Sequence, residues 1–233
     1  MIQRNASTQL STDYRFAWLA WVLGTGVGWI IIQYAGLTVT WTNGDLRTMA
    51  DIMRISMALA INGAALGMVC GLVQSLLVRK CYGSPLRWLV ATFVGYVVGL
   101  PAGFLISVCA FWIGARNSFP DLLTGNTTAI LYFPTFLTMV LSGATIAVAQ
   151  SLIYFVQTKQ MSGKETVIWI CGTALIWAAG YISTSLPGLT DILPASIRLG
   201  IAGGTIGLLA AGLMLFLRRQ HTEIPRAPMK MAH

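Results

Sequence analysis

The sequence predicts an all-α integral membrane protein with six transmembrane helices, and the amount, placement and spacing of charge predict it. Of 233 residues, 56% are hydrophobic and only 9% are charged, whereas a soluble domain usually carries about 25% charged residues. The charges gather in short stretches and leave six long uncharged runs. Each run holds roughly 20 apolar residues, enough for a helix rising about 1.5 Å per residue to cross a hydrocarbon core about 30 Å thick.

The expected elements are a leader, a six-span domain and a tail. The leader, residues 1–15, is polar and partly basic. The run that follows extends past the length of a signal-peptide core without an A-x-A cleavage site, so we expect a retained helix. The transmembrane domain covers residues 16–217 and a basic tail covers residues 218–233. The expected spans are residues 16–36, 55–78, 88–112, 129–156, 166–186 and 199–217.

The basic residues predict the orientation of the chain. Eleven of the 15 lysines and arginines fall on the side that holds both termini and the two short connections, near residues 79–87 and 157–165. Cytoplasmic loops of membrane proteins carry an excess of these residues, so we expect both termini in the cytoplasm. The net charge of +8 then reflects topology, because no soluble basic module for nucleic acid is present.

Internal similarity predicts three repeated helical hairpins. A shift of 140 residues aligns the second and sixth spans without a gap, and a shift of 76 aligns the second with the fourth through Gly67/Gly143 and Gln74/Gln150. The first shift pairs Asp51 with Asp191, Ser56 with Ser196, Leu59 with Leu199, Gly63 with Gly203, Gly67 with Gly207 and Arg79 with Arg219. The odd spans open with Trp18, Trp88 and Trp169. A fixed period favours duplication; the alternative is chance similarity among the few residue types of membrane helices.

Glycines recur every four residues along three of the spans, as in small-xxx-small stripes. The predicted helix-packing residues are Gly63, Gly67, Gly71, Gly95, Gly99, Gly103, Gly203 and Gly207. Membrane helices associate through close packing over small residues, because lipid supplies little hydrophobic drive between them. We expect the stripes to face neighbouring helices of the same bundle. The alternative is that they face another subunit or a second copy of the chain.

The largest polar side chains inside the spans are amides, namely Asn62, Gln74 and Gln150. An unpaired amide in hydrocarbon costs several kcal/mol, so we expect these three side chains to point into the bundle and form interhelical hydrogen bonds. The alternative is that they line a polar cavity for a small solute.

Three acidic residues, Asp51, Asp121 and Asp191, each precede an even-numbered span. Carboxylates at such positions cap a helix or favour its dipole. The alternative is that the three carboxylates gather at one end of the bundle and attract a cation.

The residues of familiar membrane chemistry are missing from the predicted spans, so we expect no catalytic, cofactor-binding or metal-ligating residues. Both histidines, His221 and His233, lie in the tail, all four lysines lie outside the spans, and the cysteines form no C-x-x-C pair. No H-E-x-x-H motif occurs. Ion-coupled transport typically uses intramembrane Asp, Glu, His or Arg. We therefore do not expect an enzyme.

Helices with Trp and Gly are followed by Gly-xxx-Gly-xx-Gln-like segments, seen from Gly67 to Lys80 and from Gly143 to Tyr154. This pattern resembles small, uncharacterised six-span bacterial membrane proteins over most of the spans. The third copy departs from it with Met214 in place of Gln. The resemblance implies a bacterial cytoplasmic (inner) membrane location and no particular activity.

Two functions remain open at this stage. The first is a structural or accessory subunit of a membrane complex, with the lipid bilayer and other membrane subunits, or a second copy, as partners. The alternative is a small-solute permease or the membrane subunit of a transporter. Neither implies a cofactor.

Overall fold

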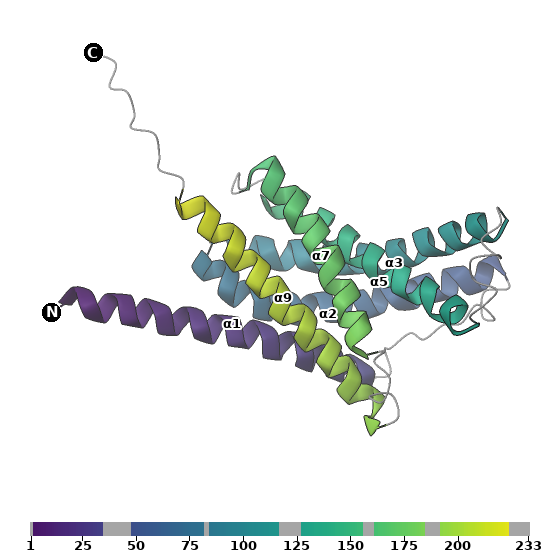
Figure 1. Cartoon of the computed structure of the whole chain (residues 1–233), viewed down its shortest axis with the longest axis horizontal. Coiled ribbons are helices and arrows are strands. Elements are labelled where there is room, and N and C mark those ends of the chain that lie inside the picture. Colours follow the sequence, from purple (N-terminus) through teal and green to yellow (C-terminus); the bar gives the residue numbers. More distant parts are fainter. Residues whose placement is uncertain are drawn as a thin grey trace, which may run out of the picture.

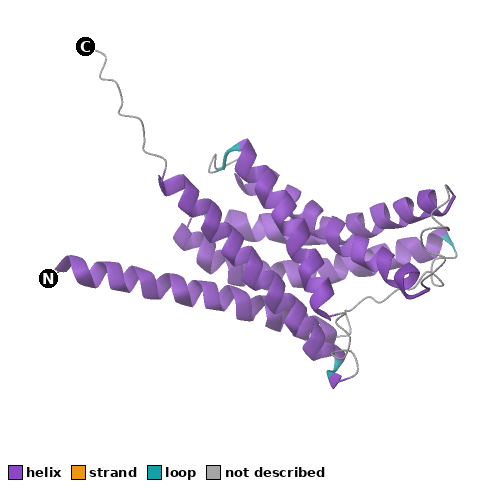
Figure 2. Cartoon of the chain, in the orientation of Figure 1, coloured by secondary structure: helices purple, strands orange, loops and turns teal. Residues whose placement is uncertain are grey.

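The chain forms a bundle of long helices, and the described residues outside them are short loops (Figures 1 and 2). This computed structural model describes residues 2–34, 48–81, 84–116, 127–155, 161–184 and 192–223. The helices are α1 (Ile2–Tyr34), α2 (Met49–Cys81), α3 (Pro85–Arg116), α5 (Thr127–Gln150), α7 (Gly163–Thr184) and α9 (Ala195–Glu223), and a π-helical turn, η2 (Ser151–Phe155), continues α5. Within these described ranges, six helices are long and apolar enough to cross a membrane, which confirms the predicted all-α architecture with six spans.

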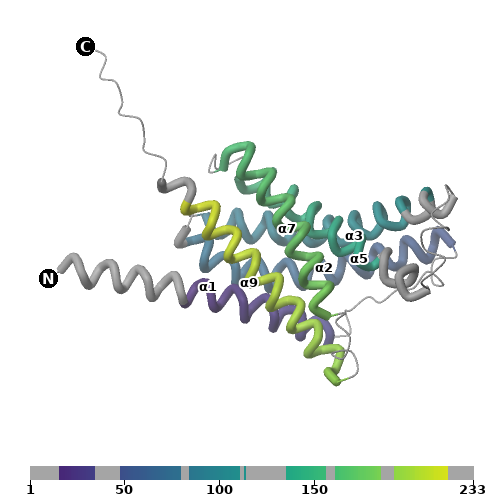
Figure 3. The backbone as a smooth tube through the Cα atoms, in the orientation of Figure 1, coloured from purple at the N-terminus to yellow at the C-terminus, as the bar shows by residue number. Residues whose placement is uncertain are grey.

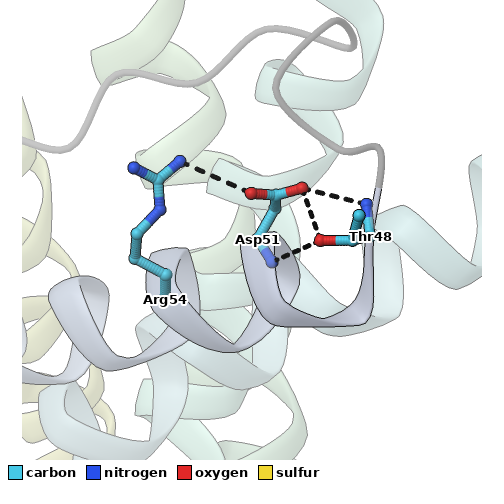
Figure 4. Close-up of polar contacts among 3 residues, drawn as sticks. All are labelled: Thr48, Asp51 and Arg54. Atoms are coloured by element: carbon cyan, nitrogen blue, oxygen red, sulfur yellow. Dashed lines mark hydrogen bonds and ion pairs between the residues drawn. The ribbon is translucent and has the colours of Figure 1, made fainter.

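A capping box sets the start of α2 at Met49, before the expected span. The Thr48 amide donates to Asp51 Oδ2 at 2.9 Å, and the Asp51 amide donates to Thr48 Oγ1 at 3.2 Å. Arg54 NH2 lies 3.8 Å from Asp51 Oδ1 (Figure 4). The two reciprocal bonds satisfy backbone donors that the first helical turn leaves free. Asp51 therefore caps its helix, while Asp121 and Asp191 lie outside the described residues.

The start of α7 uses the same device. The Ser162 amide donates to Glu165 Oε2 at 2.7 Å, and the Glu165 amide donates to Ser162 Oγ at 3.3 Å. Glu165 is buried. Because the helices begin before the expected spans, those long enough to cross a membrane include ionisable residues near their starts, namely Asp51, Glu165 and Arg198 among others.

The first and last helices, α1 and α9, extend into the predicted leader and tail. Helix α1 begins at Ile2 and so includes residues expected to form a separate leader, and α9 continues to Glu223, beyond the expected start of the tail. The remaining tail residues, 224–233, lie outside the described part of the chain.

The helices pack side by side in chain order and close into a ring. Helix α1 packs on α2, α2 on α3, α3 on α5, α5 on α7, α7 on α9, and α9 on α1. Helices α1 and α9 run antiparallel, since Ser196 Oγ lies 3.4 Å from the Tyr34 hydroxyl at one end and Gly207 faces Val22 further along. Figure 3 traces these two helices alongside one another. The six helices therefore surround one interior, whose centre we call the axis of the bundle.

Glycines occupy the closest helix contacts. Gly63, Gly67 and Gly71 of α2 face α3, Gly95, Gly99 and Gly103 of α3 face α5, and Gly203 and Gly207 of α9 face α1. A Cβ atom at Gly67 would lie 2.9 Å from Phe93 Cα, and one at Gly203 would lie 2.9 Å from the Thr25 carbonyl oxygen. Only hydrogen fits at such positions, so these glycines set the separation of the helices.

Candidate functional site

Aromatic rings from three helices meet on the axis of the bundle. Trp21 of α1, Trp88 of α3 and Trp169 of α7 are all buried. The ring centroid of Trp88 lies 6.1 Å from that of Trp21 and 6.0 Å from that of Trp169. Because α1, α3 and α7 do not adjoin one another in the ring of helices, these contacts cross its centre. Tilted and edge-to-face pairs at such distances are favourable aromatic geometries.

A second aromatic layer lies two turns further along the same three helices. The ring centroid of Trp177 lies 5.8 Å from that of Trp29 and 5.7 Å from that of Tyr96. Each residue of this layer follows its counterpart in the first by eight positions, about 12 Å along a helix. Midway between the layers each helix carries a buried threonine: Thr25, Thr92 and Thr173.

The π-helical turn adds two rings to the first layer. Tyr154 and Phe155 of η2 are buried, and their ring centroids lie 5.3 Å and 5.9 Å from that of Trp88. Phe155 also lies 5.9 Å from Trp169, centroid to centroid. A π turn at this point widens the end of α5, and it delivers two consecutive side chains to the same cluster.

Two of the three predicted amides reach one stretch of α3. The Trp88 indole Nε1 donates to Gln74 Oε1 at 3.2 Å, and Gln150 Nε2 donates to Thr92 Oγ1 at 3.1 Å. Trp88 and Thr92 lie one turn apart, whereas Gln74 comes from α2 and Gln150 from α5. Both glutamines are buried. The structure therefore brings these two residues together as interhelical hydrogen-bond partners of α3.

Asn62 does not join them. It precedes Gln74 by twelve residues on the same helix, which is about 18 Å along the axis of α2. Its side chain is buried, and its Oδ1 has no hydrogen-bond partner among the described residues.

Further buried polar atoms of the helices that carry the aromatic layers have no hydrogen-bond partner in the described part of the chain, among them Trp21 Nε1, Trp29 Nε1, Trp169 Nε1 and Thr173 Oγ1. The corresponding threonine of α1, Thr25, donates instead to the Trp21 carbonyl oxygen at 2.8 Å. Buried polar groups in proteins are nearly always paired, so these atoms stand out.

No protein-family model, curated protein or solved structure matches this chain. Its function is therefore inferred from the residues and their geometry. The described residues contain no group of three or more His, Cys, Asp or Glu side chains that could hold a metal ion.

The aromatic contacts on the axis were not predicted from the sequence. The predicted repeat pairs Trp18 with Trp88 and Trp169, whereas Trp21 is the tryptophan of α1 that contacts Trp88, and Trp18 is partly buried at the edge of the core. The missed signal is an aromatic residue, a threonine and a second aromatic residue at i, i+4 and i+8. It occurs as Trp21-Thr25-Trp29, Trp88-Thr92-Tyr96 and Trp169-Thr173-Trp177.

Proposed function

We propose that this chain is a structural or accessory subunit of a membrane complex. The observation that carries the proposal is how the interior of the bundle is filled. Aromatic rings from α1, α3, α7 and η2 occupy the axis in mutual contact, and the amides expected to line a solute path are bonded to Trp88 and Thr92. An interior filled by packed aromatic rings is typical of a core that stabilises the fold, and not of a path for solute.

The outer faces of the helices support the same proposal. Helix α2 presents Met49, Met53 and Met57 at intervals of four residues, with side chains 71%, 68% and 69% exposed. Large apolar side chains of this kind are exposed on the other helices as well. Such faces suit lipid and apolar partner helices, and methionine adapts readily to irregular apolar contacts.

The proposal includes a threefold hairpin repeat, formed by α1 with α2, α3 with α5, and α7 with α9. The aromatic-threonine-aromatic triplets of α1, α3 and α7 support it, since they start 67 and then 81 residues apart. The glycines of the even members support it as well. Gly67 of α2 faces α3, Gly143 of α5 faces α7, and Gly207 of α9 faces α1, so each even helix packs through glycine on the next odd helix around the ring.

The proposed location is the cytoplasmic membrane of a bacterium, with both termini in the cytoplasm. The distribution of lysine and arginine supports this orientation. Basic residues of the described helix ends on that side include Arg79, Arg87, Lys164, Arg218 and Arg219.

The test of the proposed function is purification of the tagged chain from its native cells in a mild detergent, followed by native mass determination. A subunit is expected to purify with stoichiometric partners, whose identity would name the complex. A mass that is a multiple of 25.1 kDa would indicate a homo-oligomer. A monomer without partners in several mild detergents would contradict the proposal.

A second candidate, a permease for a small solute, is favoured by the buried donors without partners in the bundle interior, such as Trp21 Nε1, Trp169 Nε1 and Thr173 Oγ1. Its test is solute flux into proteoliposomes that contain the chain, with Gln150→Leu as the comparison. Flux above that of empty liposomes, lowered in the variant, would favour it over the subunit.

A further inference from the structure

Exposed basic side chains gather at one end of the bundle. It is the end toward which α2 and α9 run and from which α3 and α7 start. Each of these four helices carries a lysine or arginine there, at or close to the end of its span. The four side chains are all exposed, and they are Arg79, Arg87, Lys164 and Arg219.

The contact between α7 and α9 places two of these cations at a similar depth. A Cβ atom at Gly172 of α7 would meet the side chain of Leu213 of α9. Lys164 lies eight residues from that glycine toward this end, and Arg219 lies six residues from that leucine in the same direction. At about 1.5 Å per residue their depths differ by only about 3 Å. The two helices pack side by side, so the two cations form a neighbouring pair.

Helices α2 and α3 carry a second neighbouring pair. The hydrogen bond between Gln74 and Trp88 joins these two helices at one depth. Arg79 follows that glutamine by five residues, and Arg87 directly precedes that tryptophan. Both cations therefore lie on the same side of the hydrogen bond, within about 8 Å of it along the helices.

An exposed apolar side chain accompanies each of the four cations. It lies three residues further into the span, on the same face of the helix. These side chains are Leu76 (46% exposed), Val90 (45%), Val167 (58%) and Phe216 (53%). Each helix therefore presents a positive charge at its end, next to an apolar surface that faces outward.

The protein does not compensate the charge of three of these cations. No acidic side chain lies within ion-pair distance of Arg79, Arg87 or Lys164 in the described part of the chain. The acidic residue next to the lysine, Glu165, is buried and accepts a hydrogen bond from the Ser162 amide in the cap of α7. This end of the bundle thus offers positive charge to a partner outside the chain.

We propose that this end of the bundle binds anionic phospholipid at the α7–α9 and α2–α3 interfaces. The headgroup phosphate lies between the two cations of neighbouring helices, and the acyl chains lie along the apolar side chains one turn further in. Basic residues between membrane helices bind anionic headgroups in this way. Inorganic phosphate would use the charge alone, whereas a lipid uses both parts of the surface. The inference rests on the membrane location of the helices and not on the proposed subunit role.

The opposite end of α2 supplies a matched control. Arg54 is exposed and has an exposed apolar side chain, Met57, three residues further into the span. Asp51 Oδ1 lies 3.8 Å from its guanidinium group, so the protein itself offsets the charge. If uncompensated charge determines lipid binding, Arg54 should contribute less than Arg79 or Lys164.

The experiment is native mass spectrometry of the full chain in a non-ionic detergent, titrated with phosphatidylglycerol or with phosphatidylcholine of the same acyl chains. Phosphatidylglycerol is expected to bind more tightly. The double variant Arg79→Gln/Lys164→Gln should lower the affinity for phosphatidylglycerol by about fivefold or more, because one cation near a membrane surface contributes about that factor. Arg54→Gln should leave this affinity unchanged. Thermal midpoints measured without added lipid show whether both variants are folded.

A second measurement needs no substitution. Raising the ionic strength should weaken the binding of phosphatidylglycerol and not that of phosphatidylcholine, because salt screens exposed charges. Equal affinity for the two lipids, or a loss in Arg54→Gln as large as in the double variant, would overturn the inference. Displacement of phosphatidylglycerol by an equal concentration of inorganic phosphate would identify an anion site without a lipid component and would overturn it as well. The subunit proposal is tested by the partners that co-purify, so the two proposals fail separately.

Discussion

Two adjacent glycines of α9, each replaced singly by alanine, separate the effect of helix packing from the other effects of a glycine-to-alanine substitution. Gly203→Ala and Gly204→Ala add the same methyl group to the same turn of helix. A Cβ atom at Gly203 would lie 2.9 Å from the Thr25 carbonyl oxygen and 2.8 Å from Trp29 Cγ, whereas nothing lies within 4 Å of a Cβ atom at Gly204. The Thr25 oxygen belongs to the backbone of α1, so the clash at Gly203 is relieved only if α9 and α1 move apart.

The expected magnitude follows from two opposing terms. Both variants gain about 0.8–1 kcal/mol of helix propensity on replacing glycine by alanine. Overpacking at Gly203 costs about 1–3 kcal/mol, so the two variants should differ in stability by about 2 kcal/mol. For a chain of this size each kcal/mol corresponds to roughly 2–4 °C in Tm. We therefore expect Gly203→Ala to unfold roughly 4–8 °C below Gly204→Ala.

The assay is thermal unfolding of both variants in one detergent, followed by intrinsic tryptophan fluorescence. The comparison needs no reference to the unsubstituted chain, because the propensity gain is common to both variants. Equal midpoints, or a higher midpoint for Gly203→Ala, would refute the argument that this glycine sets the distance between α9 and α1.

Three further predictions test the amide bond, the repeat and the topology. Gln74→Leu leaves the Trp88 indole N–H without its acceptor and should lower the stability of the bundle by about 0.6–1.7 kcal/mol. The same thermal assay measures this loss, and an unchanged midpoint would count against the hydrogen bond. If the hairpins are equivalent, Met214→Gln places an amide beside Trp21 as Gln74 lies beside Trp88 and offers an acceptor to its unpartnered indole N–H. The midpoint in the thermal assay should then not fall, and a clearly lower midpoint would contradict the equivalence. Ser84→Cys, in a chain whose native cysteines are replaced, should react with a membrane-impermeant maleimide only after the cytoplasmic membrane is opened, whereas labelling in intact cells would reverse the proposed orientation.

The number of spans was predictable because it depends on composition summed over long windows. The start of α2 was not, since Met49 belongs to the helix only because Thr48 and Asp51 cap it. A hydropathy window weighs Asp51 and Arg54 as polar and places the boundary after them. Charged residues at helix starts therefore lay outside the predicted spans, although the helices include them.

The candidate site was predictable only in part. Gln74 and Gln150 stand out as amides in apolar runs, and burial makes hydrogen bonding necessary. Their partners do not stand out, because Thr92 lies 58 residues before Gln150 in the chain and meets it only after α3 and α5 have packed. The choice between Trp18 and Trp21 likewise depends on which face of α1 turns toward the axis, and only contacts with α3 decide it.

The closure of the ring by α1 and α9 has a consequence for connectivity. These two helices run antiparallel side by side and bury glycine against each other's backbone as the sequence-adjacent helices do. The interface between the first and last helices is thus built like one between consecutive helices, without a covalent connection. A circular permutant that joins the end of α9 to the start of α1 through a flexible linker and opens the chain before Ser84 would retain every interhelical contact, and it should assemble the same bundle from a new first helix, α3.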